Sequence, residues 1–227
     1  MKYLLKFEKK GMMIFISHLD TQRLFHRLMK RLDVKLKYSN GFNPHPRLSF
    51  AQPLSVGHSS AAEYLEFETT EPIKFQTFKE SFNAVAPEGI RLLESWSLRD
   101  GGKAVAAVAA AARYRLEIPF FFPCMEATLD FFASEAIFAE KRSKKTKSVE
   151  KVNIRPHIVA LKPLLVSDGD VVLLSVLHAN LNPEVMLRSF YKFCGKAYER
   201  ESIRIERTSV LGWRGDELVP LESICLE

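Results

Sequence analysis

The chain has 227 residues, 47% of them hydrophobic, and a formal net charge of +6, which is enough apolar material for one large domain or two small ones. No run of about 18 apolar residues occurs, so we expect no membrane span. The three cysteines lie far apart and in none of the spacings that hold a metal cluster. This favours a reduced, cytoplasmic protein with no metal and no cofactor of its own.

The first half predicts strands and helices in approximately the order βαββαβ. In chain order these are a strand at 3–9, a short buried strand at 12–16, a helix starting after Ser17, a short strand at 34–37, a strand at 63–68, a helix at 75–85 and a strand at 90–98. Ser17 is expected to cap the first helix, with Asp20 in the position typical of a capping box.

The second half approximately repeats this order after a strong breaker of regular structure, an aspartate followed by two glycines at 100–102. An alanine-rich run at 104–112 is a connector helix or a linker. Then come a strand at 114–121, a helix at 125–136, hairpin arms at 138–142 and 149–154, strands at 158–166 and 171–177, a helix at 183–194 and a strand at 202–210.

These patterns predict an α+β fold made of two tandem ferredoxin-like (βαββαβ) domains with antiparallel sheets. The expected boundaries are 1–100 for the first domain, 101–112 for the linker and 113–227 for the second domain. A single larger α+β domain is the alternative.

The segment 38–57 contains two glycines, three prolines and two asparagines, which restrict or permit particular backbone angles. Apolar side chains within it argue against disorder. We interpret it as a rigid loop that faces a ligand, and a packed structural crossover is the alternative. The candidate loop residues are Tyr38, Ser39, Gly41, Phe42, Asn43, Pro44, His45 and Pro46.

Two groups of polar residues are candidates for a site. His18 lies in the first helical turn, where the positive helix end favours a neutral imidazole that can act as a general base or make a structural hydrogen bond. Glu63 ends an apolar row and needs a partner, so a structural salt bridge is the simpler interpretation. The sharper hypothesis is one cluster that holds a phosphate, a nucleobase edge or a metal, formed by His18, Asp20, Tyr38, Asn43, His45, Arg47 and Glu63. Its catalytic candidates are His18, His45 and Glu63.

Positive charge gathers in two places. The first helix carries Arg23, His26, Arg27, Lys30 and Arg31 opposite its apolar stripe, and seven cations lie between 141 and 155. Each group is either a solvated face or a surface that binds phosphates. The candidate nucleic-acid-binding residues are Arg23, Arg27, Lys30, Arg31, Arg47, Lys141, Arg142, Lys144, Lys145 and Lys147.

Three segments carry a family resemblance: 14–20 (IFISHLD), 38–46 (YSNGFNPHP) and 53–57 (PLSVG), followed by Ser60, Glu63 and Tyr64. With these motifs the chain resembles the bacterial radical SAM-linked proteins of the DUF2344 family. The resemblance implies a radical SAM protein as partner and an association with RNA. The sequence has no CxxxCxxC motif, so the partner and not this chain would carry the radical SAM cluster.

Together these observations predict an accessory module that binds RNA, either tRNA or rRNA, and works with a radical SAM enzyme. The first alternative is a metal-independent RNA-processing enzyme with a histidine general base. The second is a module for protein interaction only.

Overall fold

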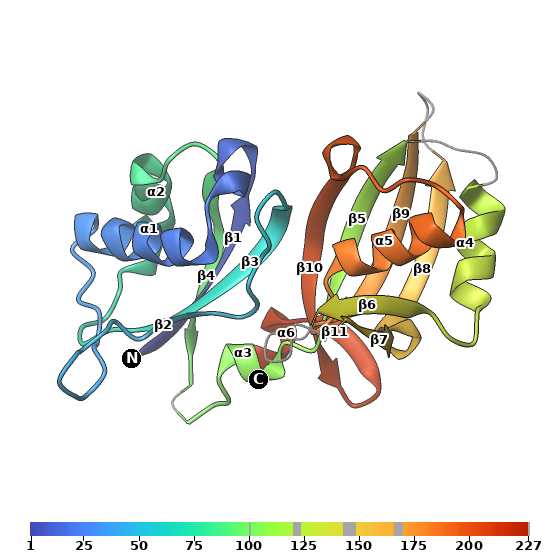
Figure 1. The fold of residues 1–227 in the computed structure, drawn as a ribbon. Coiled ribbons are helices and arrows are strands. Elements are labelled where there is room, and N and C mark those ends of the chain that lie inside the picture. Colours follow the sequence, from blue (N-terminus) through green and yellow to red (C-terminus); the bar gives the residue numbers. More distant parts are fainter. Residues whose placement is uncertain (100, 120–123, 143–148, 166–169, 227) are drawn as a thin grey trace. The chain divides into compact units, whose positions relative to one another are not determined.

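The computed structural model describes residues 1–99, 101–119, 124–142, 149–165 and 170–226 (Figure 1). The chain forms two compact units, one of Met1–Ala110 with Arg207–Glu227 and one of Ala111–Glu206. The sequence placed residues 113–227 together in the second domain, whereas the residues from Arg207 onward belong to the first unit. They do so because Val210 and Leu221 are buried in its core beside Leu4 and Tyr64. No described helix is long and apolar enough to cross a membrane.

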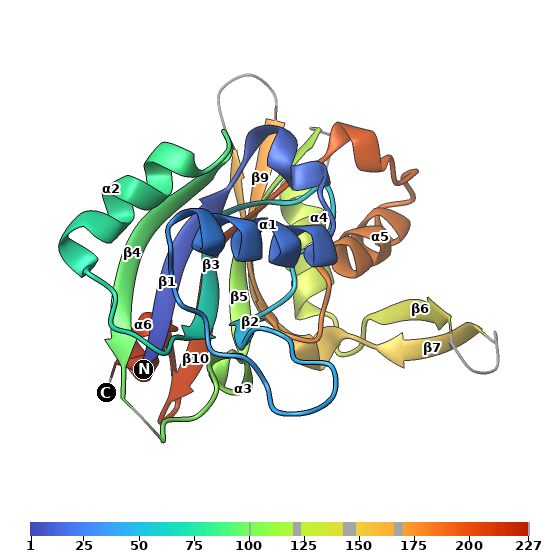
Figure 2. The ribbon, with the colours of Figure 1, turned by 90° about the vertical axis from the view of Figure 1, so that its left-hand side faces the viewer.

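The first unit is built on a sheet with two helices packed on one face (Figure 2). Its elements are β1 (Lys2–Lys9), the 3-10 helix η1 (Gly11–Phe15), α1 (His18–Arg31), β2 (Leu48–Phe50), β3 (Ser59–Glu68), α2 (Phe75–Val85), β4 (Ile90–Leu98), α3 (Val105–Val108), β11 (Glu217–Pro220), α6 (Glu222–Cys225) and the part of β10 (Arg204–Arg214) from Arg207 onward. Strand β1 lies between β4 and β3, and β2 pairs with β3. All of these pairings are antiparallel.

The predictions of two short strands, at 12–16 and 34–37, are wrong. Residues 12–16 lie mainly in η1, because Gly11 has a φ of 54° and turns the chain as soon as β1 ends. Residues 34–37 form a single bridge, between Leu36 and Thr69, and no regular strand. Conversely, the segment predicted as a loop contains the short strand β2, which pairs with β3.

The predicted start of α1 is confirmed. The backbone N–H of Asp20 donates to Ser17 Oγ over 3.1 Å, and that hydroxyl donates to the Asp20 carboxylate over 2.7 Å. The apolar stripe of α1 then faces the sheet, where the Phe25 ring lies 4.6 Å from Phe7 and 5.7 Å from Phe82 of α2. This packing fixes which side of α1 faces solvent, and therefore where its cations lie.

The sheet of the first unit is buried on both faces. Tyr3, Leu5 and Phe7 of β1 pack with the aromatic residues of α1 and α2. Leu4 points to the opposite face, which the C-terminal residues of the chain cover. For this reason three consecutive residues of β1 are buried, although the sequence of β1 suggests an alternating strand with one solvated face.

The second unit has its own core and a separate hairpin. Its elements are β5 (Ala111–Pro119), α4 (Cys124–Ala133), β6 (Phe138–Arg142), β7 (Val149–Asn153), η2 (Arg155–His157), β8 (Ile158–Leu165), β9 (Asp170–His178), α5 (Pro183–Phe193), η3 (Arg200–Ser202) and the start of β10. Strand β9 pairs with β5 and β8, and β6 pairs with β7, all antiparallel. Helices α4 and α5 meet through Phe131 and Phe190, whose ring centres are 5.3 Å apart.

The mixed α+β class and the mainly antiparallel pairing are therefore confirmed. The tandem ferredoxin-like arrangement stays a prediction. The predicted basic tip falls largely outside the described residues, since Lys144, Lys145 and Lys147 lie in the gap between β6 and β7. Lys141 and Arg142 end β6 and pair along the backbone with Glu150 and Val149.

Candidate functional site

The seven polar residues expected to form one cluster do not converge. His18 and Glu63 line one small cavity in the first unit. Four of the other side chains have partners elsewhere: Asp20 pairs with Arg23, Tyr38 with His26, His45 with Ser39, and Arg47 with Glu68. The first unit therefore carries two separate features, a buried polar cluster (Lys9, His18, Glu63 and Arg207) and an exposed surface on α1 and the loop that follows it.

Glu63 finds its partner in Arg207, which the sequence analysis missed. One guanidinium nitrogen of Arg207 donates to both carboxylate oxygens of Glu63, over 3.0 and 3.1 Å. The two side chains are only 3% and 5% exposed. Arg207 also donates to the backbone carbonyls of Gln52 and Pro53 over 3.2 and 3.1 Å. The Arg207 side chain thus holds the chain that follows β2 against β3, and it supplies donors to two partly buried carbonyls.

Lys9 and His18 complete the buried polar cluster. The Lys9 ammonium donates to the carbonyl of Ile16 over 3.1 Å. Burial lowers the pKa of Lys9, and the nearby Glu63 carboxylate opposes this shift. The His18 ring packs edge to face on Phe50 at 5.4 Å. Burial lowers the pKa of His18 and the Lys9 charge lowers it further, while Glu63 raises it. A neutral His18 agrees with its place in the first turn of α1.

The cavity that these side chains line is too small for a substrate. Its volume is about 10 Å³, roughly the space of one water molecule. His45 belongs to a different segment and contacts Ser39. Among the described residues, no group of three or more His, Cys, Asp or Glu side chains is placed to hold a metal ion. The buried polar cluster is therefore suited to fixing the conformation of the first unit and not to chemistry on a bound molecule.

Acidification is expected to weaken the fold through His18. Its folded pKa lies below the value of about 6.5 of an unfolded histidine, so the unfolded chain binds more protons between the two values. The contribution of His18 to stability is complete above about pH 6.5 and decreases as the pH falls toward the folded pKa. Urea unfolding at pH 7.5 and 5.5 should show this loss, and His18→Gln should reduce it.

A residual loss is expected in the His18→Gln variant, because burial also lowers the pKa of His26. The variant His26→Gln therefore serves as the matched comparison. An identical pH dependence in wild type and His18→Gln would show that His18 is not held neutral by folding.

The exposed surface begins with α1. Arg23, Arg27, Lys30 and Arg31 are all exposed on the side of the helix away from the sheet. Arg23 pairs with Asp20 at 3.0 Å, and the Arg27 charge acts on the same carboxylate from farther away. Within the described part of the chain, Arg27, Lys30 and Arg31 have no carboxylate within ion-pair distance. Three positive charges within five residues of one helix repel each other unless an anion binds there. These three residues are called the basic triad below.

The loop after α1 has an ordered base and an exposed tip. Ser39 and His45 face each other through three contacts: Ser39 N–H donates to the His45 carbonyl over 2.8 Å, His45 N–H donates to Ser39 Oγ over 3.1 Å, and this hydroxyl lies 3.0 Å from His45 Nδ1. Tyr38 and Pro46 form a β-bridge just outside this pair. Gly41 has a φ of 131°, an angle that side-chain-bearing residues rarely adopt. Phe42 follows it at the tip and is fully exposed.

The helix that carries the basic triad contacts the base of the loop through a pair of side chains. His26 Nε2 lies 3.1 Å from Tyr38 Oη, which joins the middle of α1 to the base of the loop. Figures 1 and 2 show the loop projecting from the first unit at the end away from α2 and from the start of α1. Arg47, at the end of the loop, pairs with Glu68 at 3.1 Å, and the same carboxylate also pairs with Lys37 at 3.1 Å. The surface therefore combines free positive charge on α1 with a projecting aromatic ring.

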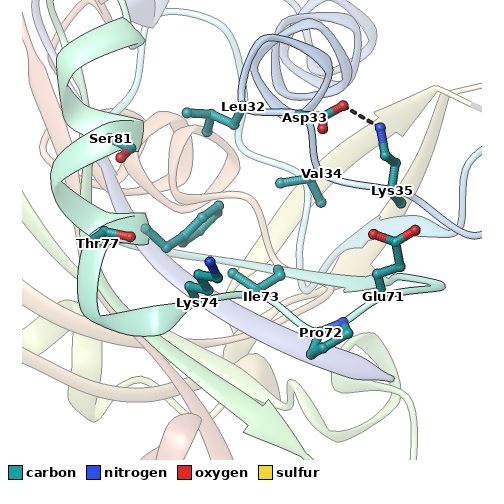
Figure 3. A pocket seen from close by; sticks show the side chains of 11 residues that line it. Leu32, Asp33, Val34, Lys35, Glu71, Pro72, Ile73, Lys74, Thr77 and Ser81 are labelled. Atoms are coloured by element: carbon teal, nitrogen blue, oxygen red, sulfur yellow. Dashed lines mark hydrogen bonds and ion pairs between the residues drawn. The ribbon is translucent and has the colours of Figure 1, made fainter.

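A further pocket of about 360 Å³ lies between the end of α1 and the start of α2 (Figure 3). Its apolar floor includes Ile73 and its rim carries two acidic and two basic side chains, Asp33, Glu71, Lys35 and Lys74. Asp33 and Lys35 form an ion pair with each other. Because the charges balance, the pocket selects neither an anion nor a cation, and we assign it no function.

Two residues of the buried polar cluster were absent from the sequence prediction. Arg207 is 144 residues away from Glu63 along the chain, so no local pattern joins them. Lys9 continues the alternating pattern of β1, and it was counted simply as the end of that strand. Its position four residues after Leu5 on the buried side was the available signal.

Comparisons with known proteins place the chain in a family. The family described as "Uncharacterized protein conserved in bacteria (DUF2344)" matches residues 2–187. No curated protein matches the chain. Among solved structures, a chain of the "Crystal Structure of a Cbf5-Nop10-Gar1 Complex" is similar, with a TM-score of 0.52, 10% identity, and coverage of 92% of this chain and 48% of that chain. This chain thus spans about half the length of that neighbour, and the likeness concerns the fold alone. On the family match, the chain belongs to the DUF2344 family.

Proposed function

We propose that this chain is an accessory module that binds RNA, either tRNA or rRNA, and works beside a radical SAM enzyme. The observation that carries the proposal is the basic triad, Arg27, Lys30 and Arg31, which is exposed and forms no ion pair within the described residues. An RNA backbone supplies the matching row of negative charges, and its binding releases counterions. Such contacts position an RNA without reading its sequence.

The loop next to the basic triad supplies groups that can recognise nucleotides. Tyr38, Phe42 and His45 are exposed on it, and aromatic and imidazole rings stack on unpaired bases. In this proposal the basic hairpin of the second unit adds a second phosphate contact, through Lys141, Arg142, Lys144, Lys145 and Lys147. Both units then take part in binding, as two tandem ferredoxin-like domains.

The radical SAM partner rests on the resemblance of the motifs at 14–20 and 38–46. The chain itself has no CxxxCxxC motif, so an iron–sulfur cluster for such chemistry must come from another protein. The structural neighbour is itself part of a Cbf5-Nop10-Gar1 complex. A role beside a partner is consistent with that precedent.

An enzyme is a poorer match to the geometry. A histidine general base needs the reacting group within hydrogen-bond reach, and His18 faces a cavity of about 10 Å³. His45 is exposed on the loop and contacts Ser39. The two histidines therefore do not share a pocket in which RNA could be cleaved.

Protein docking is the second candidate function, and one observation favours it. Met12 and Phe15 of η1 and Leu19 of α1 are 74%, 61% and 60% exposed. Val56 is also 51% exposed. The next residue, Gly57, donates its backbone N–H to the Ile14 carbonyl of η1 over 2.8 Å, which brings this segment beside η1. Exposed apolar side chains that lie close together are typical of interaction surfaces. In the proposed function they contribute to the contact with the partner enzyme.

The direct test is affinity purification of the full chain from its native cells at low salt, with identification of both proteins and nucleic acids. The proposal expects tRNA or rRNA together with a radical SAM protein, and expects the protein to remain after nuclease treatment. A radical SAM protein recovered without RNA would favour the docking role alone. Recovery of neither would contradict the proposal.

A further inference from the structure

Phe42 is the most exposed large apolar side chain of the described residues, with an exposure equal to that of a free residue. A phenyl ring that stays in water is unfavourable, because burying its apolar surface would stabilise the chain. The loop nevertheless presents this ring on an ordered base, closed by the contacts between Ser39 and His45. Because the loop is already ordered, it loses less conformational entropy when a ligand binds.

We propose that Phe42 is a stacking platform for an unpaired base, so that the RNA bound by this module is single-stranded where it meets the loop. This inference rests on the proposed RNA-binding function and specifies its ligand. An aromatic ring stacks on any base whose face is free, and a base inside a duplex has no free face. A projecting ring thus distinguishes single strands, loops and bulges from regular helices.

The surroundings of Phe42 favour a base over a protein or a membrane. Its neighbours Asn40, Gly41 and Asn43 are exposed and are polar or carry no side chain, and Pro44 is the apolar residue next to them. A protein-docking surface or a membrane anchor would need further apolar side chains beside the ring. A stacked base needs one ring and nearby hydrogen-bonding groups, which the two asparagines supply.

Because α1 and the loop are linked, the proposal has the basic triad contact the phosphates and Phe42 contact a base of the same RNA strand. His26 and Tyr38 join the helix that carries the basic triad to the base of the loop that carries Phe42. When the triad holds phosphates of the RNA, the nucleotides that follow them along the strand can reach the loop. The triad fixes the position of the strand, and the ring selects for an unpaired base.

The test uses the full chain and one RNA sequence in two forms. A 12-nucleotide single strand containing one 2-aminopurine and its duplex with the complementary strand are titrated with wild type, Phe42→Ala, Phe42→Leu and Phe42→Tyr. Anisotropy reports binding and 2-aminopurine fluorescence reports stacking. Because Phe42 is fully exposed, all three variants are expected to fold, and circular dichroism checks this.

The expected result is tighter binding of the single strand than of the duplex, with quenching of 2-aminopurine. Phe42→Ala and Phe42→Leu should weaken single-strand binding roughly 5- to 150-fold and abolish the quenching, since stacking contributes about 1–3 kcal/mol per base. Phe42→Tyr should preserve both, and duplex binding should not change in any variant.

The failures are distinguishable. If wild type binds RNA and Phe42→Ala binds it equally well, the stacking inference is wrong while the proposed function stands. If Phe42→Leu behaves as wild type, the ring makes an apolar contact and not a stack, which also overturns the inference. If wild type binds neither form of RNA at low salt, the proposed function fails and this inference fails with it.

Discussion

Replacing Arg207 by alanine is expected to lower the free energy of unfolding by about 3–5 kcal/mol. The substitution leaves the Glu63 carboxylate, which is only 5% exposed, without its counter-charge. It also removes the donors to the carbonyls of Gln52 and Pro53. A buried charge and two partly buried carbonyls then lose their partners together, and the unpaired buried charge is the larger loss. Urea or thermal unfolding of the full chain measures the effect.

Three further variants show whether the effect comes from the buried charge. Glu63→Gln should destabilise the chain strongly as well, because it leaves Arg207 charged and buried. The double variant Glu63→Leu with Arg207→Met should be less destabilised than Arg207→Ala, since removing both charges avoids the unpaired one. Lys192→Ala breaks the exposed pair with Glu140 and should cost about 1 kcal/mol or less. Equal losses in Arg207→Ala and Lys192→Ala would refute the structural role of the buried polar cluster.

Removing the basic triad is expected to weaken RNA binding about a hundredfold at 0.1 M salt. Each phosphate contact with a single strand releases about 0.7 counterion. Replacing Arg27, Lys30 and Arg31 by alanine should therefore also reduce the slope of log affinity against log salt by about two. Fluorescence anisotropy with single-stranded RNA at several salt concentrations measures both quantities.

The control for the triad carries the same change in charge. Three exposed cations elsewhere in the same unit serve as the control: Lys74 just before α2, Lys79 on α2 and Arg91 on β4. Their replacement by alanine lowers the formal net charge from +6 to +3, the same change as in the triad variant. If both triple variants lose the same affinity, binding reflects overall charge and not a surface on α1.

The regular elements were predictable where local chemistry sets their ends. Helix α2 (Phe75–Val85) and strand β4 (Ile90–Leu98) have the predicted bounds, because Pro87 and Gly89 separate two clear periodic patterns. The segment 12–16 misled the prediction, since a short apolar run fits a buried strand and a 3-10 turn equally well. The sequence could not show that the residues from Arg207 onward belong to the first unit. Val210 and Leu221 are buried against residues far away along the chain, such as Leu4.

The buried polar cluster was predictable only in part. His18 and Glu63 could be paired because each comes at the end of an apolar pattern and both needed polar surroundings. The sequence could not indicate Arg207, which reaches Glu63 from a distant strand. It also grouped His45 and Arg47 with them, because all are polar and near in sequence. The structure shows instead that the nearest partners, Ser39 and Glu68, satisfy these two side chains.

The measurement that tests RNA binding by this chain most directly is ultraviolet cross-linking of the full chain to RNA in its native cells, followed by mass spectrometry of the cross-linked peptides. We expect cross-linked nucleotides on the loop around Phe42 and on neighbouring peptides of α1. We expect them to disappear when Arg27, Lys30 and Arg31 are replaced by alanine. An absence of cross-links, or cross-links confined to peptides outside α1 and residues 38–47, would contradict this account.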